Sequence, residues 1–544
     1  MADIELHRMG ARGVNLDLPA HELDPEWWTL VNNVRFQQGT IHPFTGQMQT
    51  KGTPLVKPRW LLPVPVGGNF YWVVIGESAP GLHKIYCIDG TTHTDITAGA
   101  GTVVGADTAR WNGGVLNGIP FMSNGLSAPK AWINPAPATP TADFAAWTPG
   151  YLATMLAKVI RPFKNYLVAL QLTEDGVLDN YVLRWSHPAA PGTLPSSWDD
   201  TDATKDAGRT TLAETSDFLV DCLPLGDTNI IYKESSIIGM SFIGGNDVFR
   251  FFTIIPDAGL IARDCVCAYN NRKNHFVISK DDVLTFNGQT TESIANDRVR
   301  RTLFTTINGD HLDKCWTANN LREREVWFAY PSVASADGWP DRVLVFNYID
   351  NTLTFRDLGD PTIGATDTAA FGTSGYVSTT VGSSWDSDSE SWDSDVSTWD
   401  DALGAKNVGD ILIAAGGSAL LLWTANQGYK YDDYTFTWLV ERTSLAVTGR
   451  DRAGNWVVEP HRRKLVTEIW IQAGGQPFYV QLGGAEKTDG AIKWGPIKLF
   501  TPETQEKLGF TVGGKYIAVR FYGTAYSTIT GFTLNQSIVG RYNG

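Results

Sequence analysis

The amino-acid sequence predicts a mostly β protein with a β-propeller-like central region and a C-terminal β-sandwich or jelly roll. From about residue 55 to 440, short runs of β-branched and aromatic residues alternate with turns rich in Gly, Asp and Asn. Strand–turn–strand units recur there at a loose spacing of roughly 40–60 residues, which favours the antiparallel meanders of propeller blades. From about residue 441 the runs lengthen and alternate apolar with polar positions, as in a sheet with one buried face.

A chain of 544 residues is too long for one ordinary core and is expected to form two to four domains. We place an N-terminal arm with a docking hairpin at residues 1–54, the propeller-like region at 55–440 and the sandwich at 441–544. A string of sandwiches is the alternative to the propeller, because no blade signature is strict enough to count blades. Short helices are expected near 152–159 and 297–308. The expected strands include 70–75, 84–88, 166–170, 181–185, 229–233, 275–279, 326–330, 342–347, 464–472, 515–522 and 527–534.

The first 54 residues are typical of an arm and not of a domain. Asp24 and Pro25 suit the start of a short helical turn, and two short strands flank Gly39. So short a segment cannot bury its own large apolar side chains, so the arm must dock on the rest of this chain or on another subunit. The candidate docking residues of the arm are Trp27, Trp28, Arg35 and Phe36.

Residues 383–401 repeat a Trp-Asp pair every seven residues, at Trp385, Trp392 and Trp399. In a strand, residues seven apart point to opposite faces, and Ser, Asp and Gly are poor residues for a helix interior. The WD repeat of propeller blades has a period of about forty residues, so it does not apply here. We expect an irregular loop whose indoles cover a blade or a subunit contact. The carboxylates could bind calcium, but the EF-hand spacing with its Gly and terminal Glu is absent, so we favour a structural loop over a metal site.

No pattern of catalytic residues is present in the sequence. GxSxG, HExxH and GxxxxGK(S/T) are missing, and so is a GxGxxG that follows a strand and opens a helix. The odd number of cysteines argues against a disulfide framework, and Cys265 and Cys267 lack a zinc-site spacing. We therefore expect buried thiols, no catalytic residue, no cofactor and no metal. The chain is not expected to be an enzyme.

The net charge of −14 argues against tight binding of duplex nucleic acid, which usually requires a basic footprint. An acidic wall would instead let DNA slide past without sticking. The local basic runs at 300–301 and 461–464 are expected to be solvated surface or interface. The sequence holds no run of eighteen apolar residues and no signal-peptide pattern, so neither a membrane span nor secretion is expected.

Several segments together resemble the tail tube or nozzle proteins of short-tailed bacteriophages, also called tail stabilisation proteins. The resemblance rests on 13–39 in the arm, on 223–237, on 244–260, on the Trp-Asp repeat and on the C-terminal β-domain. It implies a hexameric ring below the head-to-tail connector, or adaptor, with tail fibres or spikes on its outside. Genomic double-stranded DNA would pass through the lumen without sequence-specific binding. The protein would be made in the host bacterial cytoplasm and reside in the virion tail.

Two other functions stay open on the residues alone. A glycan-binding adhesin or receptor-binding tail protein could stack sugars on the tryptophans of 385–399. A propeller-type glycan hydrolase would need two carboxyl groups facing each other across a sugar, which a sequence does not reveal.

Overall fold

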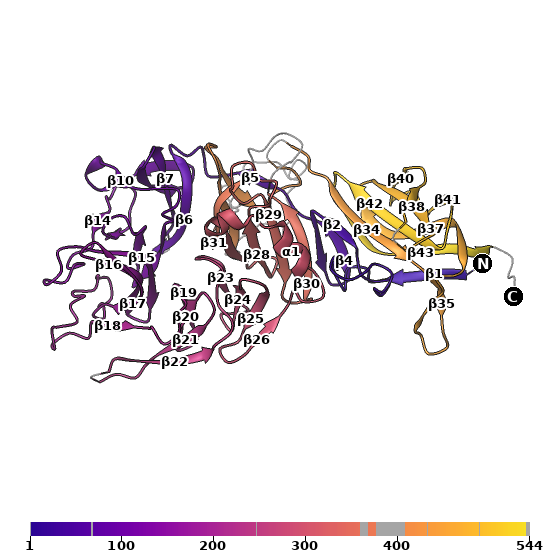
Figure 1. The fold of residues 1–544 in the computed structure, drawn as a ribbon. Helices are drawn as coiled ribbons and strands as arrows, with labels where there is room; N and C mark the ends of the chain where they lie inside the picture. The colour runs from indigo at the N-terminus through magenta and orange to yellow at the C-terminus, as the bar shows by residue number, and fades with distance from the viewer. Residues whose placement is uncertain are drawn as a thin grey trace, which may run out of the picture.

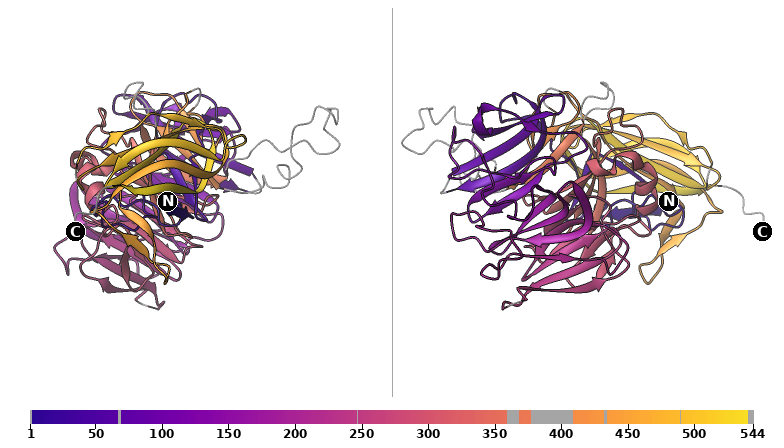
Figure 2. Two further views of the ribbon diagram at one scale, coloured as in Figure 1. Left: turned by 90° about the vertical axis from the view of Figure 1, so that its right-hand side faces the viewer. Right: turned by 60° about the vertical axis from the view of Figure 1, so that its left-hand side comes forward.

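The computed structural model describes residues 2–66, 69–245, 247–358, 368–376, 409–431, 434–488 and 490–539. Figure 1 shows an elongated molecule with a propeller at one end and a β-sandwich at the other. Figure 2 shows from two further directions that the sandwich lies against one side of the propeller. The described helical segments are α1 (Arg300–Thr306) and the 3-10 turns η1 (Ala98–Ala100) and η2 (Gly309–Lys314). The predicted fold class, mostly β with a propeller and a C-terminal sandwich, is confirmed.

Seven antiparallel sheets form the propeller within the described part of the chain. In each sheet the first strand is innermost, and neighbouring inner strands contact one another all the way round, from β6 to β31 and back to β6. The first four blades comprise β6 (Lys57–Val66), β7 (Asn69–Ala79), β8 (Leu82–Asp89), β9 (Thr92–Asp95) and β10 (Val103–Val104); β11 (Asn112–Leu116), β12 (Ile119–Ser123), β13 (Lys130–Ala131) and β14 (Ala142–Asp143); β15 (Met155–Phe163), β16 (Tyr166–Glu174), β17 (Val177–Trp185) and β18 (Gly208–Thr211); and β19 (Leu219–Leu225), β20 (Thr228–Lys233), β21 (Ile237–Phe242) and β22 (Phe249–Ile255).

The seventh blade is completed by a strand from the N-terminal arm. Blades five to seven comprise β23 (Val266–Tyr269), β24 (Asn274–Ile278), β25 (Val283–Phe286) and β26 (Thr291–Ser293); β27 (Trp316–Asn320), β28 (Glu325–Tyr330), β29 (Arg342–Asn347) and β30 (Thr352–Asp357); and β31 (Ala369–Tyr376), β32 (Gly409–Ala415), β33 (Leu422–Ala425) and β5 (Gln47–Gln49). Strand β5 pairs antiparallel with β33, with Gln49 opposite Trp423 and Gln47 opposite Ala425. Early and late parts of the chain thus close the propeller together.

The sandwich consists of two six-stranded sheets, and both contain strands of the arm. One sheet comprises β3 (Val34–Gln37), β4 (Thr40–Pro43), β43 (Ser527–Val539), β37 (Arg463–Gly475), β41 (Lys507–Gly514) and β1 (Ala2–His7). The other comprises β2 (Leu30–Asn32), β34 (Trp438–Leu445), β42 (Tyr516–Gly523), β38 (Phe478–Ala485), β39 (Lys493–Trp494) and β40 (Lys498–Phe500). Their inner faces share a core that includes Phe36, Phe478 and Phe521. A separate hairpin, β35 (Val447–Arg450) and β36 (Trp456–Val458), projects from the sandwich (Figure 1).

Two short helices were expected from the sequence, and one of them is wrong. The helix near 297–308 is present as α1, whereas 152–159 leads into the strand β15. Met155, Ala157 and Val159 are buried while Lys158 between them is exposed, which is the period of a strand, and β15 pairs along its length with β16. The expected strands between 70 and 534 lie within described strands of the propeller and the sandwich, apart from one residue at an end of 275–279 and of 515–522.

All five cysteines are free thiols. Cys267 is half-buried and the other four are buried, so the prediction of structural thiols without a disulfide framework is confirmed. Burial raises the pKa of Cys87 and of Cys222 to about 12, which keeps both in the unreactive thiol form.

Candidate functional site: the polar junction of arm, propeller and sandwich

The arm docks on its own chain, between the propeller and the sandwich. Trp28 is fully buried, its indole N–H donates to the Met9 carbonyl at 2.7 Å, and its ring meets Phe521 of the sandwich edge-on. Phe36 belongs to the same core. Trp27 is half-buried, with the Arg298 guanidinium over its ring at 5.6 Å.

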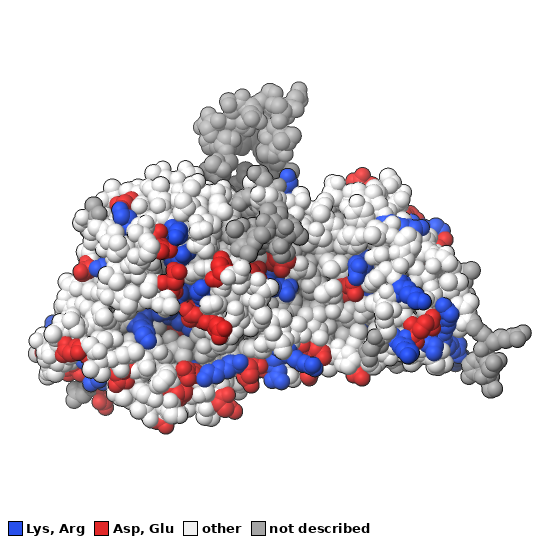
Figure 3. Space-filling view, turned by 45° about the horizontal axis from the view of Figure 1, so that its top comes forward, with Lys and Arg blue, Asp and Glu red and all other residues white. Residues whose placement is uncertain are grey.

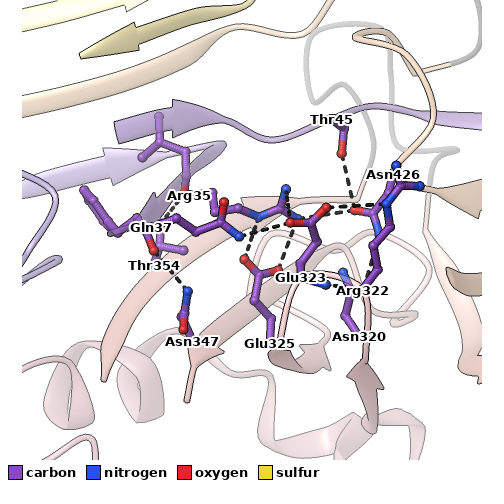
Figure 4. A network of polar contacts seen from close by, with 12 residues as sticks. Arg35, Gln37, Thr45, Asn320, Arg322, Glu323, Glu325, Asn347, Thr354 and Asn426 are labelled. Carbon is purple, nitrogen blue, oxygen red and sulfur yellow. Dashed lines mark hydrogen bonds and ion pairs between the residues drawn. The ribbon is translucent and has the colours of Figure 1, made fainter. Parts of the chain in front are cut away.

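Arg35 forms the centre of the junction. Its Nε lies 2.5 Å from Oε1 of Glu325 and its Nη2 lies 3.2 Å from Oε2, so the guanidinium grips the carboxylate at two points. Both side chains are almost fully buried, at 5% and 1% exposure. Glu323 lies 3.5 Å from Nη1, and Asn426, next to the end of β33, accepts a bond from Nη2 at 3.3 Å. Figure 4 shows these groups converging from the arm, the sixth blade and the seventh blade.

Burial and the partner's charge act in opposite directions on both members of this pair. Burial opposes the charge of Arg35, but the carboxylates of Glu325 and Glu323 outweigh it and raise the pKa of the guanidinium. Burial raises the pKa of Glu325, and Arg35 partly offsets that rise. Each charge therefore depends on the other. Removing Arg35 would leave Glu325 without this cation in the interior, whereas removing Glu325 would leave Arg35 with Glu323 as its remaining carboxylate.

A second arginine lies beside this pair in an aromatic cage. Arg356 is fully buried, with its guanidinium 4.8 Å from the Trp327 ring centroid, 5.3 Å from that of Phe44 and 5.6 Å from that of Tyr431. Burial lowers its pKa. Phe44 comes from the arm, Trp327 from the sixth blade and Tyr431 from the segment that leads into the sandwich, so the cage joins all three parts.

Polar contacts also fasten the arm on both sides of the Arg35 centre. Asn33, which has a φ of +56°, donates to Asp357 at 3.2 Å and to the Thr437 carbonyl at 3.0 Å. Asp17 accepts backbone N–H bonds from Arg301 at 2.7 Å and from Thr302 at 2.9 Å, which caps the first turn of α1.

The buried Arg442 of β34 binds backbone carbonyls of the arm between residues 20 and 23. It donates to the carbonyls of Ala20 and Leu23, each at 2.9 Å, and burial lowers its pKa to about 10. The arm therefore contacts both bodies through backbone and side chains alike.

The propeller has a second ionic cluster, at the end where the inner strand β23 begins. Arg161 of the third blade binds Asp221 of the fourth through Nε at 2.8 Å and Nη2 at 2.7 Å. Its Nη2 also lies 2.8 Å from Asp264, which leads into the fifth blade. The guanidinium lowers the pKa of Asp221 against the opposing effect of burial. These charges tie three blades together and leave neither carboxylate free for acid–base chemistry.

Three cations surround Trp339, a buried indole beside the same end of the propeller. The charged groups of Lys314, Arg59 and Arg110 lie 4.3, 4.9 and 5.8 Å from the Trp339 ring centroid. Arg59 also pairs with Glu77 at 3.1 Å and with Asp107 at 3.0 Å. The cations of this cluster therefore make contacts both within a blade, as between Arg59 and Glu77, and between blades, as between Arg59 and Trp339.

Among the described residues, no group of three or more His, Cys, Asp or Glu side chains could hold a metal ion. Within the same part of the chain, no helix is long and apolar enough to cross a bilayer. These charge pairs and aromatic cages therefore have a structural role, because they hold separate elements of the chain together.

Of the residues singled out from the sequence, Trp28 and Phe36 are buried in one core, Arg35 forms the centre of the polar junction, and Trp27 is half-buried. Trp385, Trp392 and Trp399 lie outside the described residues. Sequence reasoning missed Glu325, the main partner of Arg35. A signal existed, because Glu325 opens a strand whose other residues are all apolar, and a buried carboxylate requires a partner.

No family model matches this chain, and no curated protein matches it. Among solved structures, a catalytically inactive variant of virginiamycin B lyase from Staphylococcus aureus, crystallised with quinupristin, is similar at a TM-score of 0.38 and 10% identity. That match covers 70% of this chain and 97% of the lyase. A TM-score this low carries no inference about activity, and the propeller rests on the sheet order described above.

Proposed function

We propose that this chain is a structural subunit of the ring-shaped tail tube, or nozzle, of a short-tailed bacteriophage. In this proposal six copies form a ring below the head-to-tail connector, genomic DNA passes through the lumen, and tail fibres or spikes attach outside. The residues that resemble nozzle proteins carry the proposal, together with the physical role that the arm plays in this fold.

The arm residues that bear the resemblance are those that clamp the propeller to the sandwich. Asp17 caps α1, Asn33 bridges to Asp357, and Arg35 pairs with Glu325. Gly13 has a φ of +79°, and a Cβ there would lie 3.0 Å from the Leu353 carbonyl oxygen of the sixth blade. A wall segment around a DNA conduit must keep its shape under load, and this clamp gives two β-domains one fixed arrangement.

Charge is consistent with a conduit that does not grip DNA. The chain carries −14, and acidic and basic side chains are interspersed on the face in Figure 3, without a basic stripe. The hydrolase alternative gains no support from the buried cluster at Arg161, because both of its carboxylates already bind that arginine.

Negative-stain electron microscopy of the purified chain tests the proposal directly. We expect closed rings of one symmetry with a central hole, and sedimentation velocity should give the mass of six chains. A chain that stays monomeric at high concentration, with and without the connector protein of a short-tailed phage, would refute the nozzle assignment. Binding on a glycan array by such a monomer would favour the adhesin.

A further inference from the structure

A surface groove of about 330 Å³ lies between the fourth and fifth blades. Its walls come from β19–β20, β22 and the turns of the fifth blade, along the lower edge of the propeller in Figure 1. Leu225 and Ile230 are buried at its floor, whereas Phe252 is 38% exposed. The lining residues that matter here are Leu225, Ile230, Phe252, Ile254, Arg272 and Lys273.

The groove combines apolar walls with a basic rim. Arg272 and Lys273 are exposed, and Arg250 is exposed on the same strand as Phe252, two residues earlier. Among the described residues, none of these three cations has an ion-pair partner, although the chain as a whole is acidic. The carboxylate next to the groove, that of Asp227, is paired with Lys164 at 3.5 Å.

The backbone that carries the rim is strained. Asn270, Asn271 and Arg272 are consecutive residues with φ of +51°, +56° and +59°, the left-handed region that an arginine rarely adopts. The turn between β23 and β24 thereby presents Arg272 and Lys273 at the groove. Phe252 and Ile254 belong to β22, the outermost strand of its blade, so an extended segment could lie along this wall.

We propose that this groove binds residues 383–401 of a second copy of the chain. This inference rests on the proposed ring and names one contact between its subunits. The segment supplies what the groove lacks: three indoles for the apolar walls and seven carboxylates for the basic rim, with no Lys, Arg or His among them. Attraction between opposite charges favours the contact, and burial of indole surface adds to it.

The segment is attached to the same face of the propeller as the turns that line the groove. The segment leaves the seventh blade between β31 and β32, where Tyr376 pairs with Gly409, and the groove is built partly from the equivalent turns of the fourth and fifth blades. Inner strands all begin their blades, so these connections share one face of the propeller. Thirty-two residues separate Tyr376 from Gly409, and an extended chain of half that number reaches at most about 50 Å. One segment and one groove per copy give a head-to-tail contact, the type that closes rings.

Cross-linking of a mixture of unlabelled and ¹⁵N-labelled chains tests which copy supplies the segment. Full-length chain with natural nitrogen and an equal amount of ¹⁵N-labelled chain are mixed as monomers, allowed to assemble together, and then treated with a carbodiimide, which joins lysines to carboxylates. We expect links from Lys273 to 386–401, half of them between light and heavy copies, and none from Lys493, an exposed lysine of the sandwich. Links confined to one isotope would mean that the segment binds its own groove and would overturn the proposal.

Binding of a labelled peptide of residues 383–401 tests the groove chemistry. The protein is the full-length chain with Trp385→Ser, Trp392→Ser and Trp399→Ser, so that its own segment does not compete. Adding Arg272→Glu and Lys273→Glu should weaken peptide binding at least tenfold, and higher salt should weaken it further. Adding Arg452→Glu and Lys493→Glu, which change the net charge equally at exposed sites, should change it less than twofold. No binding, or equal loss in both pairs, would overturn the proposal.

The outcomes separate this inference from the proposed function. Rings in electron micrographs without Lys273 links or peptide binding would refute the groove contact and leave the nozzle standing. Mixed-isotope links and peptide binding by a chain that forms no rings would support the groove contact and refute the nozzle assignment.

Discussion

Replacing Arg35 by methionine removes the cation at the junction while keeping a long apolar stem. The change leaves Glu325, 1% exposed, with only the Trp327 indole N–H at 3.2 Å as a described side-chain donor. Breaking a buried pair by removing one partner costs about 3–5 kcal/mol. The two charge-assisted bonds lost, at 2.5 and 3.2 Å, would sum to a similar loss at about 1.5–3 kcal/mol each. We therefore expect Arg35→Met to lower the free energy of unfolding by about 3–5 kcal/mol.

A double-mutant cycle isolates the pair. Glu325→Gln alone leaves Arg35 with Glu323 at 3.5 Å, and the double variant removes both charges of the pair, so the coupling should be about 2–3 kcal/mol. Urea denaturation followed by tryptophan fluorescence measures each variant. Lys507→Met is the control, because its pair with Glu468 is 47% and 33% exposed and should contribute less than about 1 kcal/mol. Single-variant effects that add within about 0.5 kcal/mol would refute the coupling.

Three further changes test other parts of the fold by the same denaturation assay. Burial lowers the pKa of His275 to about 4, below its usual 6.5. The free energy of unfolding should therefore fall by about 1.4 kcal/mol per pH unit as the pH drops from 6.5 toward 4. His275→Gln should remove this pH dependence, and an unchanged dependence of the unfolding free energy on pH would contradict the assignment. Asp17→Ala should cost about 0.5–2 kcal/mol by uncapping α1, whereas the exposed Glu22→Ala should cost almost nothing. A Cβ on Gly46 would lie 1.9 Å from the Lys430 carbonyl oxygen, so Gly46→Ala should cost at least about 1–3 kcal/mol at the propeller closure. Gly150→Ala, with open space around it, is the control, and equal effects would argue against the steric reason.

Individual strands could be predicted from the sequence, whereas the long-range strand pairings that close the propeller could not. Alternating or continuous apolar runs identify strands such as β24 and β37 because side-chain period and β propensity act within a few residues. The helix expected at 152–159 failed because pairing of β15 with β16 overrides a weak local preference. The number of blades depends on which inner strands meet, and the pairing of β5 with β33 joins residues more than 370 positions apart. No local pattern encodes that contact.

In the candidate site, too, local features were predictable from the sequence and long-range partners were not. Arg35 and Trp28 stood out because a short arm cannot bury such side chains alone, yet their partners could not be named. Glu325 is 290 residues from Arg35, and Arg161 meets Asp221 and Asp264 only because inner strands converge at the axis. A charged residue within an apolar strand reveals that a partner must exist, and only the fold supplies its identity.

The strands of the arm pair with sheets of their own chain, and this limits which surfaces remain for contacts between subunits. Its strands complete both sheets of the sandwich and the seventh blade. Deleting residues 1–40 would remove β1–β3 and the first residue of β4, so we expect the deletion to disrupt the fold before it could test ring formation. Contacts between copies must therefore use surface that the chain itself leaves open. The groove between the fourth and fifth blades is such a surface, with exposed Phe252 and three cations that have no ion-pair partner among the described residues. If a ring forms, its subunits are held by surfaces of this kind, while the arm keeps each subunit rigid.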